Sequence, residues 1–220
     1  MSKLKILTID GPSASGKGSL SRNIAKHLGF KILDSGLLYR TYAYFSQSGP
    51  NIEEISNRIN NEISFSFNEN DVSILHKDKD ITSLLRSETT AKIASQLSAL
   101  PKTREDLLTI QRDFYNQDGL VADGRDMGTV VFPKAALKIF LTASPEVRAK
   151  RRHLELQKRG QEVNMLDLIA DIELRDMKDR TRTLSPLIPA EDSVVIDSSN
   201  MSIDEVLSFT KKLTKKEFNK

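Results

Sequence analysis

Nine residues near the N-terminus have the composition and spacing to bind phosphate. "GPSASGKGS" places glycine, four residues, glycine and lysine in order, which is the pattern of a phosphate-cradling loop. The glycines would allow tight turns that point peptide N–H groups at phosphate oxygens, and the lysine would bring charge to the terminal phosphates. The candidate phosphate-binding residues are Gly11, Pro12, Ser13, Ala14, Ser15, Gly16, Lys17, Gly18 and Ser19. Ser19 is also a candidate Mg²⁺ contact, directly or through water.

The flanking sequence supplies the strand and helix that such a loop requires. Apolar residues at 6, 7 and 9 predict a buried strand, and Leu20, Ile24 and Leu28 form one stripe of a helix over 17–28 that Gly29 would end. This context disfavours an ordinary glycine-containing turn. The hydroxyl of Ser19 comes one position later than usual, because Gly18 follows Lys17. The resulting "GKG[ST]" ending resembles that of nucleoside monophosphate kinases.

A second anion site is predicted where the next strand ends. In "LDSGLLYR", Asp34 or Ser35 can cap a helix whose next turn presents Tyr39 and Arg40. A helix N-terminus beside an arginine would attract a phosphate that faces the phosphate-cradling loop. The alternative is that Arg40 is an ordinary surface residue.

Charged residues also follow the predicted strand in "VADGRDMGTVVFP". Asp123 stands at the strand end, as does the carboxylate that holds Mg²⁺ or its waters in phosphoryl-transfer sites. Arg125 and Asp126 follow a turn at Gly124. Taken alone, this cluster could be a salt-bridged turn.

A third cluster, "RDMKDRTR", has helical spacing. Arg175, Asp179 and Arg182 are four and three residues apart, which predicts one shared helix face. Alone it would favour a ladder of ion pairs along the helix. Beside a phosphate loop, the arginines would instead offer charge to a transferring phosphoryl group.

The elements that must position these residues alternate along the chain. Strands are predicted over 4–10, 30–34, 119–123, 137–143 and 193–197, with helices between them that include 17–28 and 145–158. This order predicts an α/β fold with a parallel sheet covered by helices on both faces. Alternating apolar residues around a turn at 68–71 predict an antiparallel hairpin, within an insertion over about 36–95.

Composition narrows the remaining possibilities. The 220 residues include no cysteine, which excludes disulfides, thiolate catalysis and cysteine-ligated zinc and suits a reducing cytoplasm. His27, His76 and His153 are far apart and predict no metal site. The net charge of +3 gives little reason to expect a polyanionic partner, and the basic C-terminal tail reads as a solvated helix face. We expect neither a transmembrane helix nor a signal peptide, and a monomer.

Five motifs together carry a specific family resemblance. "IDGPSASGKGS", "LDSGLLYR", "IASQLSALPKTRE", "VADGRDMGTVVFP" and "LRDMKDRTR", in this order and spacing, resemble the bacterial cytidylate kinases from about residue 4 to 207. The resemblance implies an adenylate-kinase-like fold with a core over 1–35 and 96–220. It also implies a monophosphate-binding lobe with a small antiparallel sheet over 36–95, and a short lid within about 150–165.

The same resemblance implies a role for each matching residue. Ser35, Arg40 and Arg125 would hold the CMP phosphate, and Ser95 and Arg104 would read the cytosine edge. Asp126 and Asp179 would reach the ribose. Lid residues Arg151 and Arg152 would close over ATP. The implied catalytic residues, which neutralise charge on the transferring group, are Lys17, Arg125, Arg175 and Arg182. Of these, Arg175 and Arg182 would bridge the donor phosphates and the CMP phosphate, so that Arg182 is also a CMP-binding residue.

Departures from the family pattern and competing functions stay open at this point. "SASGKGS" replaces the more usual "SGAGKGT", and "DITSLLRSETT" lacks the glutamate and isoleucine expected before Arg86, so no role is assigned to that segment. The acceptor could be UMP, AMP, dTMP or shikimate, although Ser95 with Arg104 favours a pyrimidine with an exocyclic amine. An RNA-binding module and a regulatory nucleotide switch are the alternatives from other classes. Residues 148–182 contain no Phe, Tyr or Trp to stack on bases, which argues against the RNA-binding module.

Overall fold

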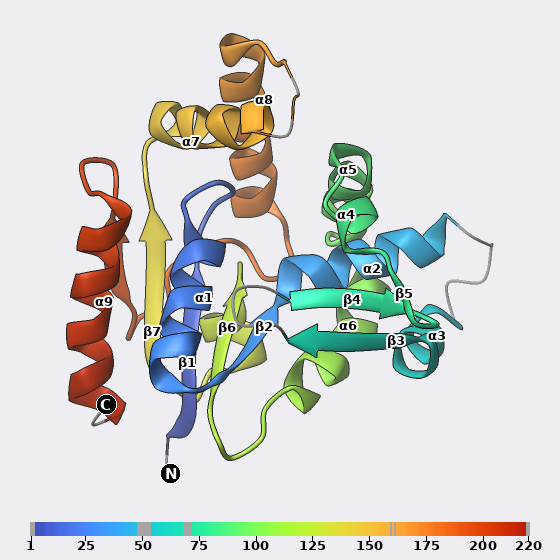
Figure 1. Cartoon of the computed structure of the whole chain (residues 1–220), viewed down its shortest axis with the longest axis horizontal. Helices are drawn as coiled ribbons and strands as arrows, with labels where there is room; N and C mark the ends of the chain where they lie inside the picture. Colours follow the sequence, from blue (N-terminus) through green and yellow to red (C-terminus); the bar gives the residue numbers. More distant parts are fainter. Residues whose placement is uncertain (1–2, 48–53, 68–71, 159, 161, 219–220) are drawn as a thin grey trace.

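The computed structural model describes residues 3–47, 54–67, 72–158, 160 and 162–218. Within them lies a five-stranded sheet of order β2-β6-β1-β7-β8, in which every neighbouring pair is parallel. These strands are β1 (Leu4–Asp10), β2 (Lys31–Asp34), β6 (Leu120–Gly124), β7 (Ala135–Thr142) and β8 (Val194–Asp197). The parallel sheet predicted from the sequence is therefore confirmed, and its carboxyl ends share one edge (Figure 1).

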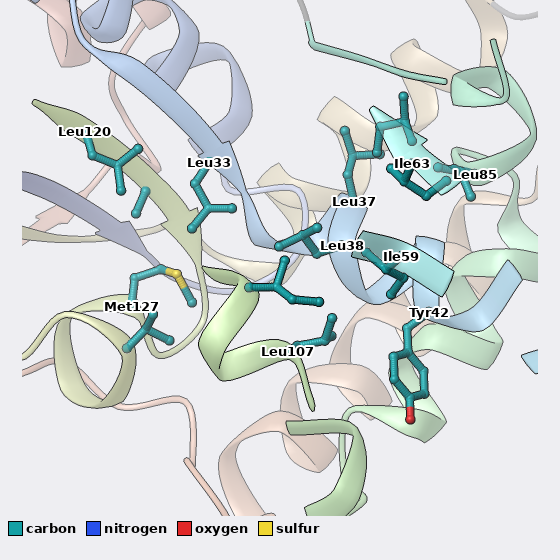
Figure 2. Close-up of a cluster of buried hydrophobic side chains, with 14 of the residues drawn as sticks. Leu33, Leu37, Leu38, Tyr42, Ile59, Ile63, Leu85, Leu107, Leu120 and Met127 are labelled. Atoms are coloured by element: carbon teal, nitrogen blue, oxygen red, sulfur yellow. The ribbon is translucent and has the colours of Figure 1, made fainter. Parts of the chain in front are cut away.

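Two buried clusters cover the two faces of this sheet. On one face, Leu7 and Ile9 pack with α1 (Lys17–Leu28) and α9 (Ile203–Phe218). On the other, Ile6 packs with α2 (Ser35–Ser46), α6 (Pro101–Asp113) and the π-helix η2 (Met127–Val131). Figure 2 shows this second cluster, in which Leu33, Leu37, Leu38, Leu107 and Met127 point toward one another. Both faces are buried, as a parallel sheet requires.

The helices that leave β1 and β2 begin where the sequence predicts. Gly16, the N-cap of α1, has φ 97°, and Gly29 ends that helix with φ 65°, a left-handed conformation that glycine adopts without a steric penalty. Asp34 caps α2 by accepting a hydrogen bond from the Leu37 backbone N–H at 3.0 Å. The Ser35 and Arg40 side chains therefore start from a fixed helix end.

A separate antiparallel sheet confirms the predicted hairpin. It has the order β3-β4-β5 and follows α3 (Ile55–Glu62). Its strands are β3 (Ile63–Phe67), β4 (Val72–His76) and β5 (Lys79–Asp80), and the predicted turn at 68–71 lies outside the described residues. The sequence reading missed β5, because Lys77 and Asp78, rather than asparagine and glycine, supply the positive φ angles of its turn. His76 has structural contacts, being hydrogen-bonded to Tyr44 and to Glu62.

Two further helices stand beyond the carboxyl edge of the sheet (Figure 1). They are α7 (Pro145–Lys158), with the predicted bounds, and α8 (Met165–Thr181). Helix α8 ends one residue before Arg182, which is its C-cap with an extended backbone, so the predicted single helix face holds for Arg175 and Asp179 but not for Arg182. The short α4 (Thr82–Leu85) and α5 (Glu88–Leu97) connect the small sheet to α6. In the described part of the chain, every helix is too short or too polar to cross a membrane.

Candidate active site

A cavity of about 760 Å³ opens at the carboxyl edge of the central sheet. The loop after β1 and the N-terminal ends of α1 and α2 form part of its wall. Residues of α5, α6, α7, α8 and α9, and of the segments that follow β6 and β8, also line it. Among the described residues, only Gly11 and Pro12 of the predicted site do not line it. The predicted residues that do are Ser13, Ala14, Ser15, Gly16, Lys17, Gly18, Ser19, Ser35, Arg40, Ser95, Arg104, Asp123, Arg125, Asp126, Arg151, Arg152, Arg175, Asp179 and Arg182.

Gly11 lies outside the cavity lining, against β7. A Cβ at Gly11 would lie 2.0 Å from the backbone oxygen of Leu141 on β7. Glycine is therefore needed so that the chain leaving β1 can pass close to β7. Pro12 contributes its backbone oxygen, which accepts a hydrogen bond from Lys17 Nζ at 2.7 Å. Both residues shape the loop from behind the cavity.

The Lys17 ammonium group lies buried under the phosphate loop. Burial, with the nearby Arg125 charge, lowers the pKa of Lys17 to about 7, although Asp123 acts in the opposite direction. An anion bound in the loop would reverse this depression, because it would stabilise the charged form. The loop is thus electrostatically suited to bind phosphate at Lys17.

Two buried carboxylates stand at neighbouring strand ends. Burial raises the pKa of Asp123 to about 7 and that of Asp10 to about 6. Asp10 accepts hydrogen bonds from the backbone N–H groups of Met127 at 2.8 Å and Gly128 at 2.7 Å. It therefore anchors the chain that directly follows Arg125 and Asp126. This role was missed, although Asp10 ends a predicted strand.

The donor set at Asp123 fits a magnesium ion that also binds nucleotide phosphates. Asp123 and the Ser19 hydroxyl both line the cavity, and Asp123 Oδ2 lies 3.6 Å from the point where a Cβ on Gly18 would be. Within the described residues, no cluster of three acidic or histidine side chains forms a complete cage. Magnesium commonly takes one or two carboxylates and completes its shell with phosphates and water.

Arginines from two elements meet around Asp179. Arg125 donates from Nε to Asp179 Oδ2 at 3.3 Å and from Nη2 to Ser13 Oγ at 3.0 Å. Arg182 Nη1 lies 3.8 Å from Asp179 Oδ1. Among described atoms, buried Arg175 Nε and Arg182 Nη2 have no hydrogen-bond partner, and burial, together with Arg125, lowers the pKa of Arg175 to about 10. Such a concentration of cationic donors is suited to a bound polyanion.

The cavity wall at α2 and α6 presents polar side chains suited to a nucleoside. Arg104 forms an ion pair with Asp126, donates to the Ser98 backbone oxygen at 3.0 Å, and lies over the Tyr39 ring at 5.9 Å. Residues predicted to read the base and the ribose are therefore paired with each other. Ser35 Oγ accepts from the buried Gln111 Nε2 at 2.8 Å, a positioning contact that no sequence pattern indicated.

Arg40 explains the placement of the segment around residue 86. Its Nη1 donates to the backbone oxygens of Leu85 at 2.8 Å and Ser87 at 3.1 Å, between α4 and α5. This segment, to which the sequence assigned no role, therefore holds the predicted phosphate ligand Arg40 in place at the cavity wall.

The arginines of α7 connect it to both sides of the cavity. Arg151 Nη1 donates to the Ser15 backbone oxygen at 3.0 Å, and Nη2 donates to the Ser198 backbone oxygen at 2.7 Å. Arg152 forms ion pairs with Glu155 on its own helix and with Glu88 of α5. The adjoining wall is apolar and was missed by the sequence reading; it contains Leu154, Met201, Ile203, Val206 and Leu207.

Comparison with known proteins matches the chain to one family. The family model described as cytidylate kinase matches residues 7–216. The cytidylate kinase of Vibrio parahaemolyticus is 46% identical over 213 residues, covering 94% of this chain and 93% of that protein. The cytidylate kinase of Serratia proteamaculans is 45% identical over 207 residues, covering 92% of this chain and 90% of that protein.

Solved structures of low sequence identity support the fold alone. An uncharacterized protein from Eubacterium ventriosum is 12% identical with a TM-score of 0.53, covering 97% of this chain and 99% of that chain. A Thermus thermophilus protein is 14% identical with a TM-score of 0.51, covering 99% and 98%. The full-length family match and the close relatives are decisive: the chain belongs to the cytidylate kinase family.

Proposed function

We infer that this protein catalyses the ATP-dependent phosphorylation of CMP and dCMP to their diphosphates. The observation that carries this inference is that one cavity is lined by all of the groups that a donor and an acceptor require. They are the phosphate loop with Lys17, the arginines around Asp179, and the paired Arg104 and Asp126. Arg125 contacts both Ser13 of the loop and Asp179, so a donor nucleotide at the loop and an acceptor at Arg104 would bring their phosphates together at these arginines.

The donor end has the features that ATP requires. Backbone N–H groups of the loop from Ser13 to Ser19 and the N-terminus of α1 would bind its phosphates. The apolar wall at Leu154, Met201 and Ile203 would take the adenine, and Arg151 and Arg152 would close over the nucleotide. Mg²⁺, held through Asp123 and Ser19, would neutralise charge on the donor phosphates.

The acceptor site would bind CMP through residues on α2, α5, α6 and α8 and on the loop after β6. Ser35, Arg40 and Arg125 would hold the phosphate, which explains why Gln111 and the Leu85 and Ser87 carbonyls fix two of these side chains. Ser95 and Arg104 would bond the cytosine. Asp126 and Asp179 would reach the ribose, and Asp126 holds Arg104 in the cavity before the base arrives.

Chemistry then proceeds by one direct, in-line displacement. An oxygen of the CMP phosphate attacks the γ-phosphorus of ATP, the bond to the β–γ bridging oxygen breaks, and that oxygen leaves with ADP. The attacking oxygen is already anionic near neutral pH, so no general base is required. Lys17, Arg125, Arg175 and Arg182 neutralise charge that develops on the transferred group.

The monophosphate lobe and the lid proposed from the sequence indicate why closure of the site would matter. The monophosphate lobe over 36–95 carries Arg40 and Ser95, whereas the lid within about 150–165 carries Arg151 and Arg152. Closure of both over the core would exclude water that could compete with CMP as acceptor. We further propose a cytoplasmic monomer with nucleotide substrates and no nucleic-acid or membrane partner.

The direct test is ADP release from ATP–Mg²⁺ with CMP, dCMP, UMP, AMP and dTMP offered separately. We expect the highest kcat/KM with CMP and dCMP, because the cavity offers hydrogen-bonding groups for the base at Ser95 and Arg104. A preference for AMP or dTMP would contradict the acceptor assignment while leaving the donor site intact.

A further inference from the structure

Arg148 is a buried cation that the proposed chemistry does not use. It lies in the first turns of α7 and is 2% exposed. Its Nε donates to the Ala143 backbone oxygen at 2.8 Å, and its Nη1 donates to the Ser13 backbone oxygen at 3.2 Å. Its two terminal nitrogens also bond both oxygens of Asp176 on α8, with Nη1 to Oδ1 at 3.1 Å. One side chain thereby joins the end of β7, the phosphate loop and α8.

The contacts of Arg148 form part of a closed ring. Asp176 directly follows Arg175 and precedes Asp179 by one helical turn. Asp179 accepts from Arg125, which in turn donates to the Ser13 hydroxyl. Ser13 therefore receives one hydrogen bond on its backbone oxygen, from Arg148, and one on its side chain, from Arg125. We call this closed path, through Ser13, Arg148, Asp176, Asp179 and Arg125, the Ser13 ring.

Helix α8 depends on such polar contacts because little of it is in an apolar core. Along its described length, the buried residues are Ile172, Asp176 and Asp179. Large apolar side chains of α8, such as Leu174 and Met177, are about half exposed, at 46% and 55%. Apolar packing alone therefore fixes the helix weakly, whereas its buried carboxylates bond to arginines on neighbouring segments.

We propose that Arg148 and Asp176 are positioning residues that set the placement of the α8 arginines relative to the phosphate loop. This inference rests on the proposed function, in which Arg175 and Arg182 neutralise the transferring phosphoryl group. Electrostatic stabilisation of that group depends on donors held in place before the reaction, and a displacement of about 1 Å can reduce a rate by about a hundredfold. Within the ring, Arg148 and Asp176 do not line the cavity, whereas Ser13, Arg125 and Asp179 do, so the ring connects the substrate-binding residues to a buried ion pair behind them.

The sharpest variant is Arg148→Lys, which keeps the charge beside Asp176. A lysine cannot bond the carboxylate in a bidentate manner while also reaching carbonyls of two other segments. We expect kcat to fall by roughly tenfold to a hundredfold, with KM for ATP and for CMP each changing by less than about threefold. A purely structural role would lower the melting temperature or the folded fraction, but would leave kcat per folded molecule unchanged.

A pair of carboxylate changes separates placement of α8 from the loss of a partner to a buried cation. Asp176→Asn breaks the ring, whereas Asp192→Asn removes the carboxylate that pairs at 2.8 Å with the buried Lys138, away from the cavity. We expect the first change to lower kcat as Arg148→Lys does, and the second to leave kcat unchanged even if it lowers the melting temperature. Equal kcat for the two variants would contradict the proposal.

The double variant Arg148→Met, Asp176→Leu keeps the proposal testable if a single variant fails to fold. Replacing a buried ion pair with apolar side chains of similar volume often preserves or increases stability. We expect a folded protein whose kcat stays low, because the bonds to Ser13 and Ala143 are gone. Wild-type kcat in this variant would overturn the proposal.

Arg182→Ala, measured alongside, separates failure of this inference from failure of the proposed function. If Arg182→Ala keeps wild-type kcat, the assignment of the α8 arginines to catalysis is wrong. If Arg182→Ala loses activity while Arg148→Lys does not, only the ring is wrong.

Discussion

The phosphate loop and α8 both bring positive charge to the same part of the cavity, but they are held in different ways. The loop follows β1, whose Leu7 and Ile9 are fully buried within a parallel sheet, and the approach of Gly11 to β7 leaves no space for a side chain there. Helix α8 stands beyond the sheet edge, and polar contacts of Asp176 and Asp179 connect it to the loop.

This difference suggests that the phosphate loop is a rigid donor site, whereas the arginines around Asp179 together with Arg152 form an adjustable clamp. Apolar packing is dense and non-directional, so the sheet fixes the loop whether or not a nucleotide is bound. Charge-assisted hydrogen bonds are directional and can exchange partners. Arg152 and Arg182 can therefore leave Glu88 and Asp179 when phosphates enter the cavity, whereas the Ser13 ring keeps α8 in place.

The largest expected effects come from removing one cation from the phosphate loop or from the end of α8. Lys17→Ala and Arg182→Ala should each lower kcat by about a hundredfold or more, because each removes charge from the transferring group. Circular dichroism should show both variants folded. Wild-type turnover by either folded variant would remove that residue from the catalytic set.

Arg104→Ala should change selectivity more than catalysis. Arg104 contacts Asp126 and Tyr39 and is assigned to the base rather than to the phosphates, so its loss should leave base-edge groups unpaired. We expect the ratio of kcat/KM for CMP over UMP to fall by about tenfold or more. Lys17→Ala provides the contrast, because it should lower kcat/KM for CMP and for UMP without changing their ratio.

Protonation of Asp10, the last residue of β1, provides a pH test of the phosphate-loop side of this comparison. Burial raises the pKa of Asp10 to about 6 from 3.8, so the folded state holds this proton more tightly than the unfolded state. The stabilisation is present at low pH and is lost as pH rises through about 6. The group should contribute a decrease of up to about 3 kcal/mol in the free energy of unfolding.

The Asp10→Asn variant isolates this contribution. Chemical unfolding from pH 4.5 to 7 should show a smaller decrease in the free energy of unfolding for this variant than for the wild type. Identical pH profiles would mean that Asp10 is not the buried titrating group. The comparison is confined to pH values at which both proteins are folded.

The smallest effect is expected at the ion pair between Glu88 and Arg152. This pair connects α5 to α7 across the mouth of the cavity, and the Glu88 side chain is half exposed. Exposed ion pairs contribute about 0–1 kcal/mol, so Glu88→Gln should strengthen ATP binding without CMP by a few-fold at most, by freeing Arg152. Calorimetric measurement of ATP binding checks this. The comparison variant is Glu155→Gln, which removes the other carboxylate partner of Arg152. Weaker ATP binding by Glu88→Gln would contradict the expectation.

Local sequence signals predicted the sheet and the main helices, and long-range contacts explain what they missed. The strand, glycine and capping patterns gave the bounds of α1 and α7 and the cap at Asp34, because each depends on residues a few positions apart. Gln111 meets Ser35 across 76 positions, and Arg148 meets Asp176 across 28. No periodicity connects residues so distant, so their pairing required the structure.

The candidate site shows the same division. Five motifs brought nearly all predicted residues to one cavity, yet they did not reveal that Arg104 and Asp126 bind each other, or that Arg40 holds the carbonyls of Leu85 and Ser87. Side-chain partners depend on packing among α2, α5 and α6 rather than on any one motif. Motif spacing thus predicted which residues meet, but not how they are held.

The most direct test of this account is ADP formation from ATP–Mg²⁺ by the purified protein, measured first without an acceptor and then after addition of CMP. If the donor site transfers phosphate only after the arginine clamp has closed, almost no ADP should form before CMP is added. After CMP is added, one CDP should form for each ADP. ADP formation at the same rate without CMP would contradict direct transfer between the two ends of the cavity.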